Sequence, residues 1–259
     1  MRILACFKIV RDLENVIDSD WKSAKDAGFR IDYTKKLIND ADQGALETAL
    51  RIKDEEPETE LCAVTVSGED AASFFTGLFA VGYDTGARLI PKEDLTWTPG
   101  ETAALLADYA EKTGPYDLIL TGAQAPPGDS RQVPYLVAET LGLPCVDHVR
   151  MASHKEGELL VQRRTQTADE VYVIRGPVVL AVEDPQYAYL RVPTLRERLK
   201  VKGKKADAID CCPQENESGA RVLELRPARQ ERNCRFAEAD EVPRILETLL
   251  AETGQEDAR

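Results

Sequence analysis

Short apolar runs alternate with amphipathic helical patterns along the first half of this chain. Apolar runs at residues 2–10, 61–66, 87–90 and 117–120 are each followed by a segment with helical periodicity. A strand, a helix and a second strand in succession form a βαβ unit, in which the strands pair in parallel. The alternation therefore predicts an α/β fold, with a mostly parallel sheet and helices on both of its faces.

The helical segments carry residues that are typical of helix ends. The predicted helices begin near residue 39 and span residues 69–81, 99–114 and 130–142. Asn39, Asp40 and Asp42 are potential N-caps of the first helix, and the last two helices end at a glycine. The fourth helix is thus expected to begin at about Ser130.

The pattern changes after Pro144. Residues 149–153, 158–166 and 171–174 resemble short strands joined by polar turns, which predicts an antiparallel insertion. The run VVLAV at residues 178–182 is apolar at every position, as is typical of a strand in the interior of a parallel sheet. A polar stretch at residues 207–219 is expected to be irregular.

The C-terminal end holds one further predicted helix. Asp240 is its potential N-cap, and apolar residues follow at helical spacing, namely Val242, Ile245, Leu246, Leu249 and Leu250. This stripe either folds back on its own domain or packs on a partner. We expect an α/β domain at residues 1–205 and a C-terminal arm at residues 206–259. The basic segment at residues 195–205 is either a solvated surface or a face for an acidic partner.

Charge and composition argue against several classes of protein. The formal net charge of -13 disfavours binding to nucleic acid or to an anionic membrane, which needs clustered Lys and Arg. The longest apolar run is too short to span a membrane, and the first ten residues read as a strand rather than an export signal. The six cysteines have no CxxC spacing, which favours reduced thiols over disulfides or a metal site, and a cytoplasmic location.

Three strand-to-helix junctions are candidate ligand-binding segments, at residues 39–42, 67–68 and 122–132. In an open α/β sheet, ligands bind at the carboxyl ends of the strands, where helix N-termini present unpaired N–H groups to a phosphate. Gly122 and Gly128 permit close approach of the backbone, and Gln124, Asp129 and Gln132 offer polar groups. This inventory suits an adenine nucleotide.

A simpler interpretation of the third junction is that Asp129 or Ser130 only caps the helix that follows. The phosphate-loop patterns GxxxxGK[ST] and GxGxxG are both missing from the sequence. The catalytic patterns GxSxG and HExxH and any paired metal-ligand spacing are missing too, and His148 and His154 read as solvated or structural. We therefore expect no catalytic constellation and no metal site.

Several segments resemble the β subunit of electron-transfer flavoprotein. Between about residues 2 and 205 they are, in order, CFKIVRD, INDADQGALETALRIKDE, VTVSGEDA, AVGYD, LILTGAQAPPGDSRQVPYLVAETLGLP and GPVVLAVEDPQYAYL. The fifth segment is the most specific, because the family carries Gly-x-Gln-Ala, a downstream Asp, a Gln and a Pro before a helix. The matching residues here are Gly122, Gln124, Ala125, Asp129, Gln132 and Pro134.

The resemblance implies a Rossmann-like, adenine-nucleotide alpha-hydrolase-like α/β domain that pairs with an α subunit carrying the redox-active FAD. The β subunit would bind AMP as a structural ligand or, in electron-bifurcating members, a second FAD. The C-terminal arm would contact the α subunit. The implied nucleotide site consists of Cys6, Asn39, Asp40, Ala41, Asp42, Ser67, Gly122, Ala123, Gln124, Ala125, Asp129, Ser130, Arg131, Gln132 and Val133.

The resemblance also implies a loop that docks on flavin dehydrogenases, those of the acyl-CoA type among them. Tyr187 and Leu190 match that loop, and Leu190 is the expected anchor. Without the resemblance, an exposed leucine would be incidental.

Some positions depart from the family pattern. The usual Asn-Pro-Phe turn is Asn39-Asp40-Ala41 here, which puts a carboxylate near the expected phosphate, and Pro126-Pro127 replaces Ile-Asp. The segment LTWTPGET is only loosely similar to the pattern of the bifurcating members. We therefore expect AMP rather than FAD as the ligand, and an empty or altered pocket is a further alternative. A stand-alone adenine-nucleotide module of the universal-stress type is the main alternative, and a small-molecule transferase is a weaker one.

Overall fold

The computed structural model describes residues 1–13, 15–17, 19–20, 33–68, 71–155, 157–183, 186, 188–211 and 236–248. The chain divides into two units, Met1–Leu225 and Arg226–Arg259. We describe each unit by itself. Within the described residues, no helix is both long enough and apolar enough to cross a membrane.

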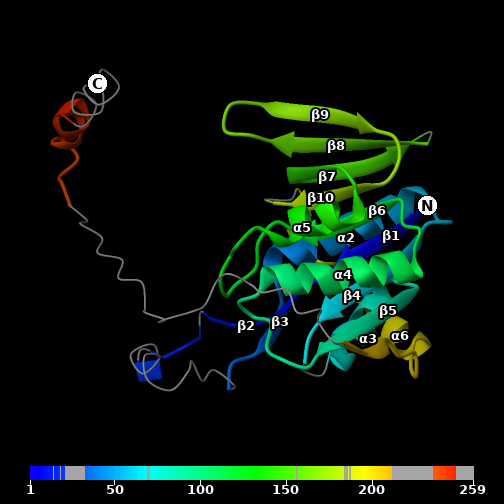
Figure 1. Ribbon diagram of the computed structural model, residues 1–259. Helices are drawn as coiled ribbons and strands as arrows, with labels where there is room; N and C mark the ends of the chain where they lie inside the picture. Colours follow the sequence, from blue (N-terminus) through cyan, green and yellow to red (C-terminus); the bar gives the residue numbers. More distant parts are fainter. Residues whose placement is uncertain are drawn as a thin grey trace. The chain divides into compact units, whose positions relative to one another are not determined.

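The first unit is built on a nine-stranded sheet (Figure 1). Its order is β11 (Asp207–Cys211), β5 (Thr85–Pro91), β4 (Glu60–Val66), β1 (Arg2–Cys6), β6 (Leu118–Gly122), β10 (Val178–Val182), β7 (Cys145–Lys155), β8 (Glu158–Arg164) and β9 (Asp169–Ile174). The pairs from β11 to β7 are parallel, and β7, β8 and β9 pair antiparallel. The predicted mostly parallel sheet is confirmed, and the predicted antiparallel strands extend this same sheet.

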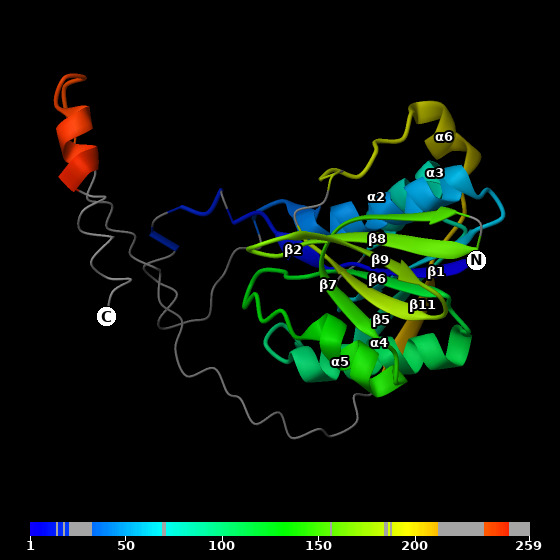
Figure 2. The same ribbon diagram turned by 90° about the horizontal axis from the view of Figure 1, so that it is seen from above.

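Helices cover both faces of the parallel region, as predicted. Figure 2 shows α2 (Asp40–Glu55), α3 (Ala72–Val81) and α6 (Leu195–Lys200) on one side of the sheet, with α4 (Pro99–Thr113) and α5 (Val133–Leu141) on the other. A small antiparallel pair, β2 (Ile9–Arg11) and β3 (Lys36–Ile38), lies outside the main sheet.

The two helical layers explain why the central strands are apolar at consecutive positions. Ile3 and Ala5 of β1 belong to the core cluster that contains α2 and α3, whereas Leu4 and Cys6 belong to the cluster that contains α4 and α5. Successive side chains of a strand point to opposite faces, so a strand covered on both faces must be apolar throughout. All five residues of β10 are buried for this reason, as the sequence predicted.

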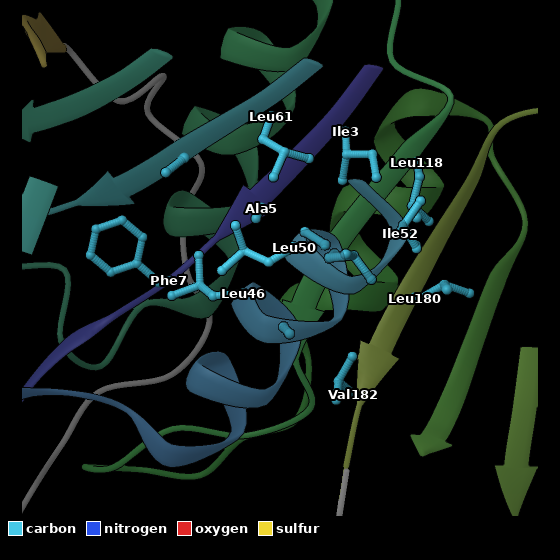
Figure 3. Close-up of a cluster of buried hydrophobic side chains, with 14 of the residues drawn as sticks. Ile3, Ala5, Phe7, Leu46, Leu50, Ile52, Leu61, Leu118, Leu180 and Val182 are labelled. Carbon is cyan, nitrogen blue, oxygen red and sulfur yellow. The ribbon is translucent and has the colours of Figure 1, made fainter. Parts of the chain in front are cut away.

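Helix α2 supplies much of the first core cluster. Its residues Leu46, Leu50 and Ile52 are buried. In Figure 3 their side chains lie against residues of the central strands, among them Ile3 and Leu118. Replacing one such leucine by alanine is expected to cost about 2–5 kcal/mol, because the cavity adds to the lost burial.

Three predicted boundaries are wrong. The first strand ends at Cys6, and Ile9 starts a separate strand, because Lys8 turns the chain toward α2. The helix expected from Ser130 begins at Val133, since Asp129 (φ 38°) and Arg131 (φ 56°) are left-handed. The helix expected from residue 69 begins at Ala72 in the described part of the chain.

Strand β11 lies beyond the expected domain boundary at residue 205, in a stretch that the sequence analysis expected to be irregular. It pairs in parallel with β5 at the edge of the sheet. Most of its side chains are exposed, so its formation rests on backbone hydrogen bonds that leave no apolar pattern in the sequence.

The second unit is described at residues 236–248. Residues 242–248 are helical, which confirms that part of the predicted C-terminal helix, and Leu249 and Leu250 lie outside the described residues. Phe236, Val242 and Leu246 are exposed within this unit.

Candidate nucleotide-binding site

The strand order creates a topological switch point beside β1. The chain runs from β1 to β4 and β5 on one side, and the next strand, β6, lies on the other side of β1. Crevices at the carboxyl ends of such strands are the usual ligand sites of open α/β sheets. The strands β1, β4 and β6 end at Cys6, Val66 and Gly122, which places the second and third predicted junctions at the carboxyl-terminal end of the sheet. The Lys8 and Gly122 amides both donate to Asp42, which brings the first junction to the same end.

Side-chain hydrogen bonds join the first and third junctions. The Asn39 Nδ2 atom donates to the Gln124 carbonyl at 2.8 Å, and Asp42 Oδ1 accepts from the Gly122 amide at 2.8 Å. The other carboxylate oxygen, Asp42 Oδ2, accepts from the Lys8 amide at 2.8 Å. Asn39 occupies the N-cap position of α2, but its side chain makes no capping bond and serves the neighbouring loop instead.

Asp42 is buried, and desolvation raises the pKa of its carboxyl to about 6 despite the two backbone amides that favour the charged form. The packing around it is close: a Cβ atom on Gly122 would lie 2.3 Å from Asp42 Oδ1 and 2.9 Å from the Asp42 amide nitrogen. Only glycine fits at residue 122. The Gly122 amide therefore has its acceptor within the chain, and each Asp42 carboxylate oxygen already accepts one backbone amide.

The loop at residues 123–132 has further internal bonds. The Ala123 amide donates to the Val182 carbonyl at 2.9 Å, and the Asp129 amide donates to the Ala125 carbonyl at 3.3 Å. The Ser130 hydroxyl accepts from the Gln132 amide at 3.4 Å. Gln132 is the N-cap residue of α5 and makes no side-chain capping bond, so neither Asp129 nor Ser130 caps this helix.

Backbone donors remain in this loop. Among the described residues, the amides of Gln124, Ser130 and Arg131 have no hydrogen-bond acceptor. Unpaired N–H groups in a bent loop before a helix form a concave site for an anion. Gly128 has a positive φ of +99° and lies against the Trp97 ring. A Cβ atom at residue 128 would lie 3.4 Å from that ring. These amides are candidate donors for an anionic ligand.

The other residues of the predicted site lie around this loop. Cys6 is buried at the end of β1, where desolvation raises the pKa of its thiol. The Ser67 amide donates to the Leu89 carbonyl at 2.9 Å, so the second junction is hydrogen-bonded to β5. Asp40 is exposed and accepts from the Gln43 side chain at 3.1 Å. Ala41 packs against Gly122, and Val133 is the first residue of α5.

Arg131 and the histidines are engaged by carboxylates. The Arg131 guanidinium lies 2.6 Å from Glu183, which follows β10. The His148 Nδ1 atom lies 3.0 Å from Asp147 Oδ2, and His154 Nδ1 contacts Glu56. Within the described residues, no group of three His, Cys, Asp or Glu side chains could hold a metal ion.

The predicted docking loop is described in part. Leu190 is half-buried and packs against the first core cluster, and its role as the docking anchor stays a prediction. Its neighbours Tyr189 and Val192 are 79% and 85% exposed. Arg191 fixes this segment by pairing with buried Glu47 of α2 at 2.8 Å. Tyr187 lies outside the described residues.

One residue of this edge was missed in the sequence. Lys8 lies in the loop after β1, next to Cys6 and Asp42, and its side chain is half-buried. The available signal was a lysine inside an otherwise apolar run, which we interpreted as part of one long strand.

A parallel sheet with polar groups and unpaired amides at its switch point defines an α/β protein with a candidate ligand-binding crevice. The electron transfer flavoprotein domain matches residues 31–205, well over half of the chain, so the chain belongs to the electron transfer flavoprotein family. Within this family it is similar to the beta subunits, which confirms the resemblance and supports a role in electron transfer.

Three relatives illustrate this similarity. The caffeyl-CoA reductase-Etf complex subunit CarD of Acetobacterium woodii is 32% identical over 192 residues, 72% of this chain and 71% of that protein. The electron transfer flavoprotein subunit beta of Syntrophomonas wolfei is 25% identical and aligns with 97% of this chain and 95% of its own length. The putative electron transfer flavoprotein subunit YgcR of Escherichia coli is 27% identical over 96% of each chain.

Proposed function

We propose that this chain is the β subunit of a heterodimeric electron-transfer flavoprotein, and that it binds AMP at the edge formed by β1, β4 and β6. A second FAD is the alternative occupant. The observation that carries the proposal is the convergence of the first and third junctions through the Asn39–Gln124 and Asp42–Gly122 hydrogen bonds. This convergence leaves the amides of Gln124, Ser130 and Arg131 as donors for a phosphate.

In this proposal the residues of the chain bind and orient rather than react. A flavin held by the α partner would accept and release electrons. The fixed loop at residues 122–132 would hold the adenylate, and the C-terminal helix would cover its exposed Val242 and Leu246 against the α subunit. The thiols of Cys6, Cys62, Cys145 and Cys211 are unpaired, which suits a reducing compartment such as the cytoplasm.

We further propose that the segment around Tyr189, Leu190 and Val192 docks flavin dehydrogenases, those of the acyl-CoA type among them. Two strongly exposed apolar side chains within one short segment suit contact with another protein. The Arg191–Glu47 ion pair holds the segment in place, which reduces the entropy lost when a partner binds.

Extraction of the co-expressed heterodimer tests the nucleotide proposal. The protein would be produced with the α subunit encoded nearest to it, denatured, and its released nucleotides separated by chromatography. We expect about one AMP per heterodimer, or two FAD if the alternative holds. Release of neither AMP nor a second flavin would refute nucleotide binding by this chain. Failure of the two polypeptides to copurify would refute the heterodimer.

A further inference from the structure

Lys8 is held rigidly at the candidate nucleotide site. Its amide donates to Asp42 Oδ2 at 2.8 Å, and its carbonyl accepts from the Asn39 amide at 3.0 Å. The main chain of this residue is thus fixed on both sides to the start of α2. Its side chain starts from the switch point itself, two residues beyond the end of β1.

Lys8 is half-buried, and the charges of carboxylates from three different segments act on its ammonium. Desolvation lowers its pKa, and the charges of Asp42, Asp129 and Asp94 oppose that change. Among the described residues, none of these carboxylates lies within ion-pair distance of the ammonium. Asp42 already accepts two backbone amides, and Asp94 accepts from the Thr96 amide at 2.9 Å. Lys8 is therefore a half-buried cation without a direct counter-ion.

A phosphate at this edge faces an electrostatic problem. It brings negative charge into a region that already holds Asp42, Asp94 and Asp129, and like charges disfavour each other. Amide donors provide only partial positive charge. The Arg131 guanidinium is directed to Glu183, whereas Lys8 forms no ion pair within the described part of the chain, so its charge is available to offset this repulsion.

We infer that the Lys8 ammonium binds the phosphate of the adenine nucleotide and makes the site select a nucleotide over the nucleoside. This inference rests on the proposed function, because it needs the nucleotide to occupy the edge formed by β1, β4 and β6. Lys8 donates to a phosphate oxygen as a charged donor, while the loop amides orient the group. The adenine and ribose would be bound by other groups.

Titration of the emptied heterodimer with AMP and with adenosine tests the inference. We expect Lys8→Met to weaken AMP binding by about 10- to 100-fold, or 1.4 to 2.8 kcal/mol, and to change adenosine binding less than threefold. Lys8→Arg should recover most of the AMP affinity because it keeps the charge. Lys92→Met is the matched control, since Lys92 is exposed on the loop that follows β5. The same titrations are repeated with FAD in place of AMP, because FAD is the alternative occupant of the site.

The outcomes separate this inference from the proposed function. If the wild type binds AMP or FAD and Lys8→Met binds it equally well, the inference fails and the proposed function stands. If the wild type binds neither, both fail. Should Lys8→Met not fold, amine acetylation of the wild type followed by mass spectrometry gives the answer. We expect AMP to protect Lys8 and not Lys92, and equal modification of Lys8 with and without AMP would overturn the inference.

Discussion

Replacement of Arg191 by methionine tests whether the docking segment is held by a buried ion pair. The Arg191 Nη2 atom lies 2.8 Å from Glu47 Oε1, its Nε atom lies 3.1 Å from both Glu47 oxygens, and its amide donates to Glu47 at 3.1 Å. Arg191 also contacts Asp54 at 2.8 Å. The Glu47 side chain is 2% exposed and the Arg191 side chain 32% exposed, so the carboxylate depends on its partners.

The expected cost follows from what remains around Glu47. Removing one partner of a buried ion pair typically costs about 3–5 kcal/mol, because the other charge stays buried. Here Arg51 still contacts Glu47 Oε1 at 2.8 Å, and Arg191 is partly solvated. We therefore expect Arg191→Met to lower the free energy of unfolding by roughly 2–3 kcal/mol at pH 7. The exposed contact with Asp54 adds less than about 1 kcal/mol.

The effect should depend on pH in a defined direction. Burial alone would raise the pKa of Glu47, but the hydrogen bonds from Arg191 and Arg51 outweigh it and lower the pKa below the usual value of 4.5. A carboxyl whose pKa is lowered by folding contributes stability above its unfolded pKa, and this stability is lost as the pH falls through the folded pKa. The difference between wild type and variant should thus be largest near neutral pH and shrink below pH 4.5.

Urea unfolding of the purified protein, in one state of assembly throughout, measures both effects. Arg196→Met is the control, because Arg196 is exposed on α6, and its change should stay within about 0.5 kcal/mol. A loss for Arg191→Met no larger than for the control, or a loss that is the same at pH 7 and pH 4, would show that the ion pair does not stabilise this segment.

Three further predictions concern the edge of the sheet and the docking segment. Gly122→Ala places a Cβ atom 2.3 Å from Asp42 Oδ1, so we expect a loss of about 1–3 kcal/mol in urea unfolding and less bound nucleotide. Gly100→Ala, which meets open space, should show neither effect, and equal behaviour of the two variants would contradict the packing argument. Asp42→Asn leaves one backbone amide without an acceptor and should cost about 1–3 kcal/mol near pH 4, where the wild-type carboxyl is still protonated in the folded protein. Burial raises the pKa of Asp42 from 3.8 to about 6, so the wild type should lose stability as the pH rises through 6. The variant should lack this loss, and parallel stability profiles of the two proteins between pH 4 and 7 would contradict the assignment of this loss to Asp42. Tyr189→Ser should raise the KM of a dehydrogenase for the heterodimer several-fold without changing its nucleotide content, and an unchanged KM would remove Tyr189 from the docking surface.

The sequence predicted the central strands and their helices because these elements are covered on both faces. A strand such as β10, buried at every position, has an unmistakable apolar pattern. The edge strand β11 was not predicted, because exposed side chains at residues 207–210 carry no such pattern.

The segments of the candidate site were predicted, but the roles of their residues were not. Asp42 and Gly122 are 80 residues apart in sequence, and Arg191 and Glu47 are 144 apart. A sequence pattern shows that such residues are polar or small without showing which atoms they contact. The sequence predicted Asp42 as a residue of the nucleotide site, which stays a prediction, but it did not show that both carboxylate oxygens accept backbone amides of the same chain.

The hydrogen bond between Asn39 and the Gln124 carbonyl has a thermodynamic consequence for any occupant of the site. Two loops that are already bound to each other do not have to be ordered when a ligand arrives, so the entropy lost on binding is small. The bond joins two segments of the chain and involves no ligand atom, so release of a ligand does not require it to break. Emptying and refilling this edge of the sheet should therefore be possible without unfolding the domain around it.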